Sequence, residues 1–435
     1  MRISVIGCGY LGAVHAAAMA KLGHDVVGLD IDEAKVAELA AGRAPFYEPG
    51  LPELLTETVA TGRLRFTTDP AEVVGARVHF VCVGTPQKRG EFAADLTYVD
   101  AAFAGLLPYL TAGDIVAGKS TVPVGTAERL ALDLAPTGAT LVWNPEFLRE
   151  GFAVKDTLHP DRLVYGVPAG KPGEDAKAVL DEVYAVPLSE NTPLVVTDYA
   201  TAQLVKVAAN SFLATKISFI NAMAELCEAT GADVTGLADA IGYDARIGRK
   251  FLNAGLGFGG GCLPKDIRAF MARAGELGVD QALSFLREVD SINMRRRVRM
   301  VDLVREVCHG SIVGRRIAVL GAAFKPNSDD VRDSPALSVA AQMQLQGAHV
   351  VVTDPQAINN ARKRWPDLTF ADTAEEAATG ADAVLLATEW AEYRDLDPEK
   401  LALVVNEKRI LDGRNVLDPA AWRAAGWTYR ALGRR

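Results

Sequence analysis

The sequence predicts an α/β protein in which two doubly wound, Rossmann-like domains are joined by an all-helical unit with a long central helix. Residues 1–30 give an apolar strand, a glycine turn, an alanine-rich helix and a second strand, and this order of elements returns after residue 311. Between them, Tyr199–Thr230 contains neither glycine nor proline, which predicts one long helix. Because 435 residues exceed one compact core, we expect domains at 1–197, 198–310 and 311–435.

The N-terminal turn has the spacing of a dinucleotide-binding loop. The strand RISVIG leads into Gly7-x-Gly9-x-x-Gly12 and then into a helix, and this context is more specific than the glycine spacing alone. Gly7 permits the tight turn, Gly9 lets the backbone approach a pyrophosphate, and Gly12 lets the helix pack on the strand. The diphosphate is expected at the start of the helix, beside Tyr10 and Leu11, where N–H groups favour an anion.

Acidic residues follow the second strand, DVVGLD. Asp30 at its end is placed to bind the ribose hydroxyls, and together with Asp32 it would repel a 2′-phosphate, so NAD is expected rather than NADP. Lys35, one helical turn further on, is the residue that weakens this argument. The alternative is a nucleotide-type fold that binds no cofactor.

The later strands end in small or polar residues, as expected where loops form a site at the carboxyl ends of parallel strands. The first domain contributes VHFVCVGTP, DIVAGKSTVP and TLVWNPEF, and PLVVTDY leads to the long helix. In the last third RRIAVLGAAFK, the helix SPALSVAAQMQLQGA and the strand HVVVTDP mirror the N-terminus, and DAVLLAT and RILDGRN complete the sheet. Because FKPNSDDVRDSP replaces the glycine fingerprint there, we expect a nucleotide ligand other than a second NAD.

Composition excludes several classes of protein. The formal charge of −9, from 46 basic and 55 acidic residues, argues against a nucleic-acid binder. The odd, scattered cysteines contain no CxxC pair and the histidines have no metal-ligand spacing, so neither a disulfide framework nor a metal site is expected. No run of 18 uncharged apolar residues occurs, and the N-terminus fits a strand and helix better than a signal peptide. We therefore expect a cytoplasmic protein that does not bind a membrane.

One cysteine has unusual surroundings, in the segment GFGGGCLPKD. Cys262 directly precedes a predicted helix, with Pro264 suited to its first turn, and a helix N-terminus near Lys265 favours the thiolate form. Asp266 lies four residues later on the same helical face. The ordinary interpretation of a cysteine is a small buried hydrophobe. We accept that interpretation for Cys8, Cys82, Cys227 and Cys308.

Polar residues interrupt two apolar patterns. Lys206 and Asn210 are one turn apart on the long helix and face the same way, and a buried lysine is costly unless it serves a charge. The alternative is a lysine whose ammonium group reaches solvent. Glu146 and Glu150 follow one predicted strand and Thr121 ends the preceding one. Such a pair of acids is more often part of a site than a pair of solvated loop residues.

The middle segment carries features of an interface. We interpret the arginine-rich NMRRRVRMVDLVREV as a solvated or interface helix face rather than a phosphate site. The long helix needs a further apolar surface to cover it, so a homodimer through the middle helices is expected.

Together these motifs resemble the UDP-glucose/GDP-mannose dehydrogenase family over essentially the whole chain. The resemblance rests on the fingerprint, STVPVGT, NPEFLREG, Lys206 with Asn210, RIGRKFLNAGLGFGGGCLPKD and FKPNSDDVRDS. It implies an NAD domain, a helical dimerisation domain and a nucleotide-sugar domain. The implied reaction is NAD-dependent, four-electron oxidation of UDP-glucose to UDP-glucuronate through a thiohemiacetal and a thioester on a cysteine.

The resemblance also implies roles for individual residues. Cys262 would be the nucleophile, assisted by Lys206, Asn210 and Asp266, while Glu146 and Thr121 would help with water and proton transfers. Further NAD contacts are expected from Thr85, Thr121, Glu150, Lys265 and Arg332, in addition to Lys35 near Asp30. The sugar nucleotide would be lined by Phe147, Leu148, Arg149, Glu150, Lys206, Asn210, Phe251, Leu252, Asn253, Ala254 and Gly255, with Gly259, Lys325 and the partner-reaching Arg246.

Two departures leave the sugar open. Many relatives that act on UDP-glucose have serine directly before the cysteine, where this chain has Gly261, and LPKD also occurs in relatives that act on GDP-mannose. GDP-mannose and a UDP-N-acetylhexosamine are therefore alternative substrates. A two-electron oxidoreductase without a covalent step, and a non-catalytic sensor of NAD and a sugar nucleotide, are alternatives of other kinds.

Overall fold

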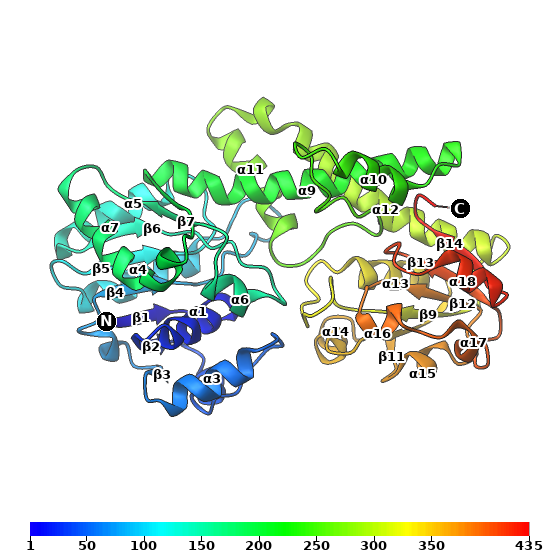
Figure 1. Cartoon of the computed structure of the whole chain (residues 1–435), viewed down its shortest axis with the longest axis horizontal. Helices are drawn as coiled ribbons and strands as arrows, with labels where there is room; N and C mark the ends of the chain where they lie inside the picture. Colours follow the sequence, from blue (N-terminus) through cyan, green and yellow to red (C-terminus); the bar gives the residue numbers. More distant parts are fainter. Residues whose placement is uncertain (435) are drawn as a thin grey trace. The chain divides into compact units, whose positions relative to one another are not determined.

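The computed structural model describes residues 1–434 and divides into two compact units. The first unit comprises Met1–Ala209 with Arg268–Gly278, and the second comprises Asn210–Ile267 with the residues from Val279 onward. Each unit contains one sheet with helices packed on it (Figure 1). The predicted α/β class with two Rossmann-like sheets is confirmed.

The sheet of the first unit has eight strands in the order β3-β2-β1-β4-β5-β6-β7-β8. All neighbours pair in parallel except β6 and β7, which pair antiparallel. The first six strands have the order of a dinucleotide-binding fold. The strands are β1 (Arg2–Ile6), β2 (Asp25–Leu29), β3 (Leu64–Thr67), β4 (Val78–Val81), β5 (Ile115–Gly118), β6 (Thr140–Trp143), β7 (Leu163–Gly166) and β8 (Leu194–Thr197).

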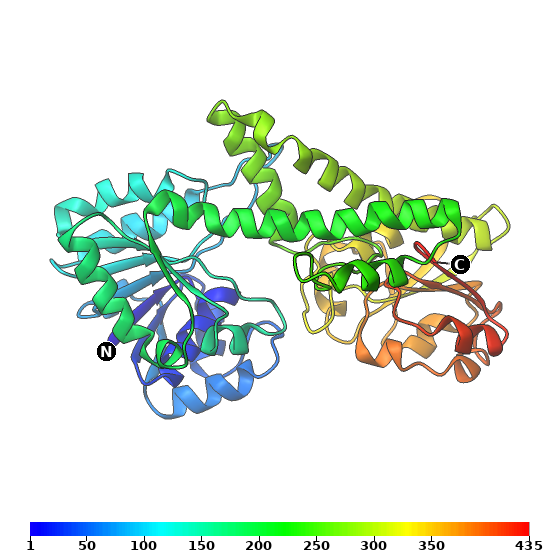
Figure 2. The ribbon, with the colours of Figure 1, turned by 45° about the horizontal axis from the view of Figure 1, so that its top comes forward.

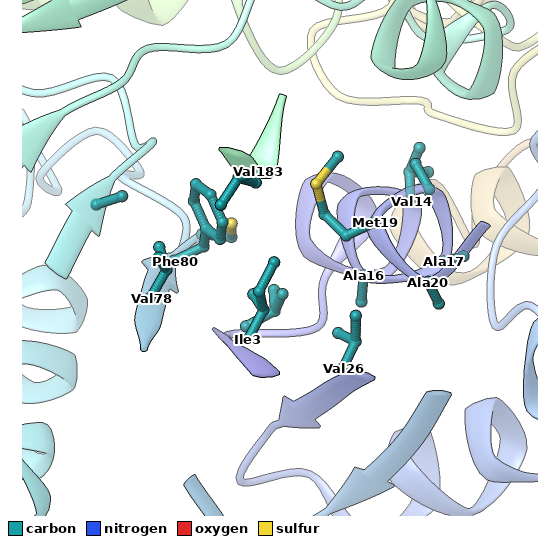
Figure 3. Close-up of a cluster of buried hydrophobic side chains, with 14 of the residues drawn as sticks. Ile3, Val14, Ala16, Ala17, Met19, Ala20, Val26, Val78, Phe80 and Val183 are labelled. Carbon is teal, nitrogen blue, oxygen red and sulfur yellow. The ribbon is translucent and has the colours of Figure 1, made fainter. Parts of the chain in front are cut away.

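Small apolar residues let the first helix pack closely on this sheet. Figure 3 shows Val14, Ala16 and Met19 of this helix in one cluster with Ile3 of β1 and Val26 of β2, and all are fully buried. Burying a valine, isoleucine or methionine side chain contributes about 1.5–3 kcal/mol. The helices of the first unit, apart from those that enter both units, are α1 (Tyr10–Lys21), α2 (Glu33–Ala40), α3 (Leu51–Ala60), α4 (Thr97–Leu106), α5 (Thr126–Leu134), α6 (Ala153–Leu158), α7 (Lys171–Val183) and α8 (Ala185–Ser189).

The second unit repeats the same topology in a smaller sheet. Its order is β11-β10-β9-β12-β13-β14, and every neighbouring pair is parallel. The strands are β9 (Arg316–Leu320), β10 (His349–Thr353), β11 (Thr369–Phe370), β12 (Ala383–Leu386), β13 (Arg409–Asp412) and β14 (Thr428–Ala431). The helices on this sheet are α13 (Pro335–Leu345), α14 (Ile358–Arg364), α15 (Ala374–Ala378), α16 (Ala391–Arg394), α17 (Pro398–Leu401) and α18 (Pro419–Ala424).

The middle of the chain is helical. Helix α9 (Tyr199–Thr230) is one unbroken helix with the predicted ends, drawn in green in Figure 2. It is followed by α10 (Val234–Gly242), α11 (Leu263–Glu276) and α12 (Phe285–Val307). Residues of α9 and α11 enter both compact units, whereas α10 and α12 belong to the second. A separate helical domain at 198–310 stays a prediction.

Candidate active site

The glycine loop of the first unit has the geometry of a diphosphate cradle. Gly7 has φ +86°, and a Cβ atom on Gly12 would lie 1.8 Å from the carbonyl oxygen of Gly7, so both positions require glycine. A Cβ atom on Gly9 would meet nothing within 4 Å. Helix α1 starts at Tyr10 and no side chain caps its N-terminus. Open space beside uncapped N–H groups fits a bound anion, as NAD requires.

Asp30 is fixed at the end of β2 beside this loop. It is 7% exposed and accepts hydrogen bonds from the backbone N–H of Cys8 at 2.7 Å and of Asp32 at 3.0 Å. The ammonium group of Lys35 lies 3.1 Å from both carboxylate oxygens. Because Lys35 is already paired with Asp30, it offers little attraction to a 2′-phosphate, and this pairing removes the reservation about NAD.

Hydroxyl groups link the ends of the next two strands. Thr85 donates to the carbonyl oxygen of Thr121 at 2.8 Å, and Ser120 donates to that of Val83 at 2.7 Å. Both predicted residues, Thr85 and Thr121, therefore lie together at the carboxyl edge of the sheet, where ligands bind in this fold.

The predicted acid and lysine form a buried ion pair. The Nζ atom of Lys206 lies 2.9 Å from Oε1 of Glu146, and their side chains are 7% and 13% exposed. Oε2 of Glu146 accepts from the N–H of Leu148 at 2.7 Å. Lys206 also lies 5.7 Å from the ring centre of Phe147, with Arg162 at 3.8 Å from the same ring. The alternative in which the ammonium group of Lys206 reaches solvent is wrong, because this group is buried and forms an ion pair with Glu146.

A second buried lysine was not predicted. Lys119, directly after β5, is 6% exposed and donates to Oδ1 of Asn144 at 3.0 Å and to its carbonyl oxygen at 3.4 Å. Burial lowers the pKa of Lys119 to about 8, although Cys82 and Glu146 oppose that change. Asn144 precedes Glu146 by two residues, so Lys119 fixes the strand end that carries the predicted acid. The sequence did not indicate this role, because a single lysine directly after an apolar strand is normally solvated.

A buried carboxylate outside the predicted set connects the cofactor loop to the segment after Glu150. Glu48 is 1% exposed and accepts from the hydroxyl of Tyr10, from the N–H of Gly151 at 2.6 Å and from that of Ala153 at 2.7 Å. Burial raises the pKa of Glu48, and these hydrogen bonds oppose the rise. Arg149 nearby pairs with Asp156 at 2.6 Å. Polar contacts with Glu48 and Asp156 thus hold residues 149–153, at the end of the segment predicted to line the sugar nucleotide, in place within the first unit.

In the second unit the predicted cysteine lies at the start of α11. Cys262 is exposed, and its carbonyl oxygen accepts from the N–H of Asp266 at 2.9 Å. Asp266 is 2% exposed and contacts Nδ2 of Asn210 at 2.6 Å and Nζ of Lys265 at 2.5 Å. Lys265 and Asp266 in the first turn of α11 and Asn210 on α9 therefore form one hydrogen-bonded group. The other four cysteines are buried, as expected.

The glycines before Cys262 are required by close packing. A Cβ atom on Gly259 would lie 2.3 Å from the carbonyl oxygen of Asp333, and one on Gly260 would lie 2.7 Å from the Phe324 ring. At Gly261 a Cβ atom would lie 2.2 Å from the guanidinium carbon of Arg332. A serine at that position would displace Arg332, which pairs with Asp330 at 2.7 Å. Side chains at these three positions would therefore clash with the loop that contains Arg332 and Asp333 or with the Phe324 ring.

The remaining predicted substrate residues lie in different surroundings. Phe251 has φ +65° and is 36% exposed, while Leu252 and Ala254 are buried. Gly255 donates to Oδ1 of Asn221 at 2.9 Å, and Asn253 accepts from Arg249 at 2.8 Å. Exposed Arg246 pairs with Asp244 at 2.6 Å, and Lys325 lies 5.5 Å from the Phe324 ring.

The interpretation of the arginine-rich helix was wrong for two residues. Arg296 and Arg297 of α12 are 1% and 2% exposed, so they are not on a solvated face. Arg296 pairs with Glu228, and Arg297 pairs with Asp333 at 2.8 Å. The acidic partners come from α9 and from the loop before α13, which a sequence pattern on α12 alone does not reveal.

The second sheet does not repeat the cofactor loop. Asp354, after β10, is 2% exposed and accepts from the N–H groups of Ala322 and Ala323 at 2.7 and 2.9 Å and from Trp390 Nε1 at 3.1 Å. Asp354 corresponds to Asp30 in topology, but it also accepts a hydrogen bond from a tryptophan side chain, which Asp30 does not. A ligand other than a second NAD is consistent with this arrangement.

Within residues 1–434 no helix has the length and apolar character needed to cross a membrane. In the same part of the chain, no group of three or more His, Cys, Asp or Glu side chains is arranged to bind a metal ion.

The first unit carries a glycine loop and a buried acid arranged as in dinucleotide-binding domains, and the second carries an exposed thiol one helical turn before a buried acid. Comparison with known proteins identifies the family. The chain belongs to the UDP-glucose/GDP-mannose dehydrogenase family, whose NAD binding domain matches residues 1–186, central domain residues 200–295 and UDP binding domain residues 318–419. It is thus an NAD-dependent nucleotide-sugar dehydrogenase.

Individual relatives match over the full length. The chain is 44% identical to a UDP-glucose 6-dehydrogenase of Rhizobium meliloti, with 100% of both chains covered. A UDP-glucose dehydrogenase structure from Pyrobaculum islandicum has a TM-score of 0.90 at 38% identity, covering 100% of this chain and 98% of that one. A UDP-D-ManNAc dehydrogenase structure from Pyrococcus horikoshii has a TM-score of 0.86 at 27% identity, covering 100% and 99%.

Proposed function

We propose that this enzyme oxidises the C6 hydroxyl group of UDP-glucose to a carboxylate, with Cys262 as a covalent nucleophile. The main observation in favour of this role is that the Cys262 thiol is exposed at the start of α11, one helical turn before the buried Asp266. The similarity to relatives named as UDP-glucose 6-dehydrogenases favours UDP-glucose as the sugar nucleotide. The overall change consumes one water and gives one uronate and three protons while two hydrides leave C6.

The cofactor would be held by the Gly7–Gly12 loop and Asp30. When bound, NAD supplies a hydride acceptor for each of the two oxidations. The contribution of the loop is to fix the diphosphate at the N-terminus of α1, where Gly9 leaves open space. Asp30 would accept hydrogen bonds from the ribose hydroxyls.

The thiol explains why oxidation continues to the acid. The Cys262 thiolate adds to C6 of the aldehyde, a C–S bond forms, and the carbonyl oxygen takes up a proton. Loss of the second hydride from C6 leaves a thioester, with the hydroxyl proton released. Water then adds to the thioester carbon, the C–S bond breaks, and the thiolate returns as the carboxylate forms. Aldehyde that is bound to sulfur does not escape into solution.

Side chains of the hydrogen-bonded groups would support the proton and charge changes. The ammonium of Lys206 and the amide of Asn210 are one turn apart on α9 and can donate to developing oxyanions, a contribution of about 3–4 kcal/mol per donor in other enzymes. Asp266 can exchange a proton through a water molecule. We propose Glu146 and Thr121 for the water and proton transfers, and the Lys206–Glu146 hydrogen bond at 2.9 Å supports this.

A homodimer formed through α9 completes the proposal. Phe212, Phe219 and Leu226 repeat every seven residues, which places them on one side of the helix. They are 67%, 48% and 57% exposed, so three large apolar side chains face water on one side of the helix, an arrangement that water does not favour. A second copy of α9 would cover these side chains. We also propose a cytoplasmic location, in keeping with cysteines that form no disulfide.

A substrate panel tests the proposal. Purified enzyme with excess NAD should produce two NADH per molecule of UDP-glucose, with GDP-mannose and a UDP-N-acetylhexosamine much slower. Cys262→Ser should no longer form uronate. One NADH per sugar with release of aldehyde would contradict the covalent route, and faster turnover of another sugar nucleotide would replace UDP-glucose.

A further inference from the structure

Two buried side chains of α12 bind the backbone of the segment that leads to Cys262. Asn293 and Arg297 are one helical turn apart and are 1% and 2% exposed. Oδ1 of Asn293 accepts from the N–H of Phe258 at 2.8 Å, and its Nδ2 donates to the carbonyl oxygen of the same residue at 3.0 Å. Arg297 donates to that oxygen at 3.2 Å through Nη2. Both backbone groups of Phe258 are therefore bound by side chains of one helix.

These polar contacts satisfy groups that would otherwise be unpaired in the interior. Phe258 is 5% exposed, and buried backbone groups are nearly always hydrogen-bonded. The approach of the chain to Asn293 also explains the preceding glycine. Gly257 has φ +88°, and a Cβ atom there would lie 2.1 Å from Oδ1 of Asn293. An apolar residue at position 293 would fill similar space, but it would remove the acceptor of the Phe258 N–H and leave the carbonyl oxygen of Phe258 with Arg297 as its side-chain donor.

Arg297 also joins this segment to the loop on its other side. Its Nη1 atom lies 2.8 Å from Oδ1 of Asp333, and the carbonyl oxygen of Asp333 faces Gly259. The N–H of Gly260 donates to the carbonyl oxygen of Arg332 at 2.8 Å. From Phe258 to Gly260 each residue is thus bonded to, or packed against, a fixed partner. These contacts fix the conformation of the glycine-rich segment that leads to the thiol.

We propose that Asn293 and Arg297 are positioning residues that set the location, and so the reactivity, of the Cys262 thiol. Three glycines separate Phe258 from Cys262, and the contacts at Gly259 and Gly260 leave little freedom to absorb a shift at Phe258. Displacement of a reacting group by about 1 Å can lower a rate about a hundredfold. The catalytic consequence rests on the proposed covalent function, whereas the effect on the thiol itself does not.

The test compares Asn293→Leu with Val301→Ala, a truncation of another buried side chain on the same helix. The first measurement is the rate at which iodoacetamide alkylates Cys262, followed by peptide mass spectrometry without sugar or NAD. The four buried cysteines serve as internal references. We expect alkylation of Cys262 to slow at least about fivefold in Asn293→Leu, because the thiol leaves the helix N-terminus that favours the thiolate. Val301→Ala should match the wild type even if it unfolds at lower temperature.

The second measurement separates positioning from stability. At a temperature where all variants are folded, Asn293→Leu should lower kcat for uronate formation at least about tenfold with an unchanged Kd for NAD. Asn293→Asp keeps the acceptor for the N–H of Phe258, so its kcat should lie between those of Asn293→Leu and the wild type. If Asn293→Leu does not fold, Arg297→Lys, which retains the charge beside Asp333, should show the same two effects more weakly.

The two proposals fail in different ways. Wild-type alkylation rate and kcat in folded Asn293→Leu and Arg297→Lys would overturn the positioning role and leave the covalent route standing. Uronate formation by Cys262→Ser would overturn the covalent route, while slowed alkylation in Asn293→Leu would still support the fixed thiol.

Discussion

Replacing Gly9 by alanine separates cofactor binding from folding. The backbone at Gly9 has φ −68° and ψ −163°, an extended conformation that alanine adopts, and the added Cβ atom meets nothing within 4 Å. The free energy of unfolding should therefore change by less than about 1 kcal/mol. The same methyl group would lie where the backbone must approach the diphosphate. We expect the Kd for NAD to rise at least tenfold, which corresponds to about 1.4 kcal/mol.

Gly12→Ala provides the matched comparison. Its Cβ atom would lie 1.8 Å from the carbonyl oxygen of Gly7, so α1 must move away from the loop. Overpacking of this kind costs about 1–3 kcal/mol or more. Urea unfolding and calorimetric titration with NAD, performed on both variants, give the two quantities separately. Gly9→Ala that binds NAD like the wild type would refute the placement of the diphosphate, and Gly9→Ala that is strongly destabilised would refute the conformational argument.

The remaining predictions concern charge, pH and assembly. Lys206→Met should lower the free energy of unfolding by about 3–5 kcal/mol because Glu146 is left buried without its cation. Adding Glu146→Gln should restore part of this loss. Equal stability of the single and double variants in urea would contradict a stabilising Lys206–Glu146 ion pair. For Lys119, burial lowers the pKa from 10.5 to about 8, so the unfolded chain binds more protons between these values. The free energy of unfolding of the wild type relative to Lys119→Met should then rise by about 3 kcal/mol as pH increases through that window. A difference that does not change with pH would contradict the lowered pKa of Lys119. Phe212→Asp should convert a dimer to a monomer in light scattering, whereas an unchanged mass would exclude this face as the interface.

The strands and the long helix were predictable because their patterns are local. The glycine turn after β1 and the uninterrupted α9 have signals within a few residues. The short strands β3, β7, β11 and β14 were not predicted. Arg65 within β3 breaks the apolar run that marks a buried strand.

The site was predictable where a residue type was unusual for its position. Cys262 among glycines and Lys206 on an apolar helix stood out, and Lys206 is indeed buried against Glu146. Glu48 and Lys119 did not stand out, because a loop acid and a strand-end lysine are normally solvated. Their burial arises from elements distant in sequence, with Glu48 bonded to Gly151 and Lys119 to Asn144. The hydrogen bonds between Asn293 and Phe258 also join residues that are distant in sequence, so they could not be inferred from the sequence of α12 alone.

The most direct test of the account is to stop the enzyme with acid during turnover of UDP-glucose and NAD and to weigh the peptide that contains Cys262. A sugar-nucleotide acyl group should be attached to that sulfur during the steady state and should be absent from Cys262→Ser. Steady formation of UDP-glucuronate with the Cys262 peptide unmodified at every sampled time would contradict the covalent role of this thiol.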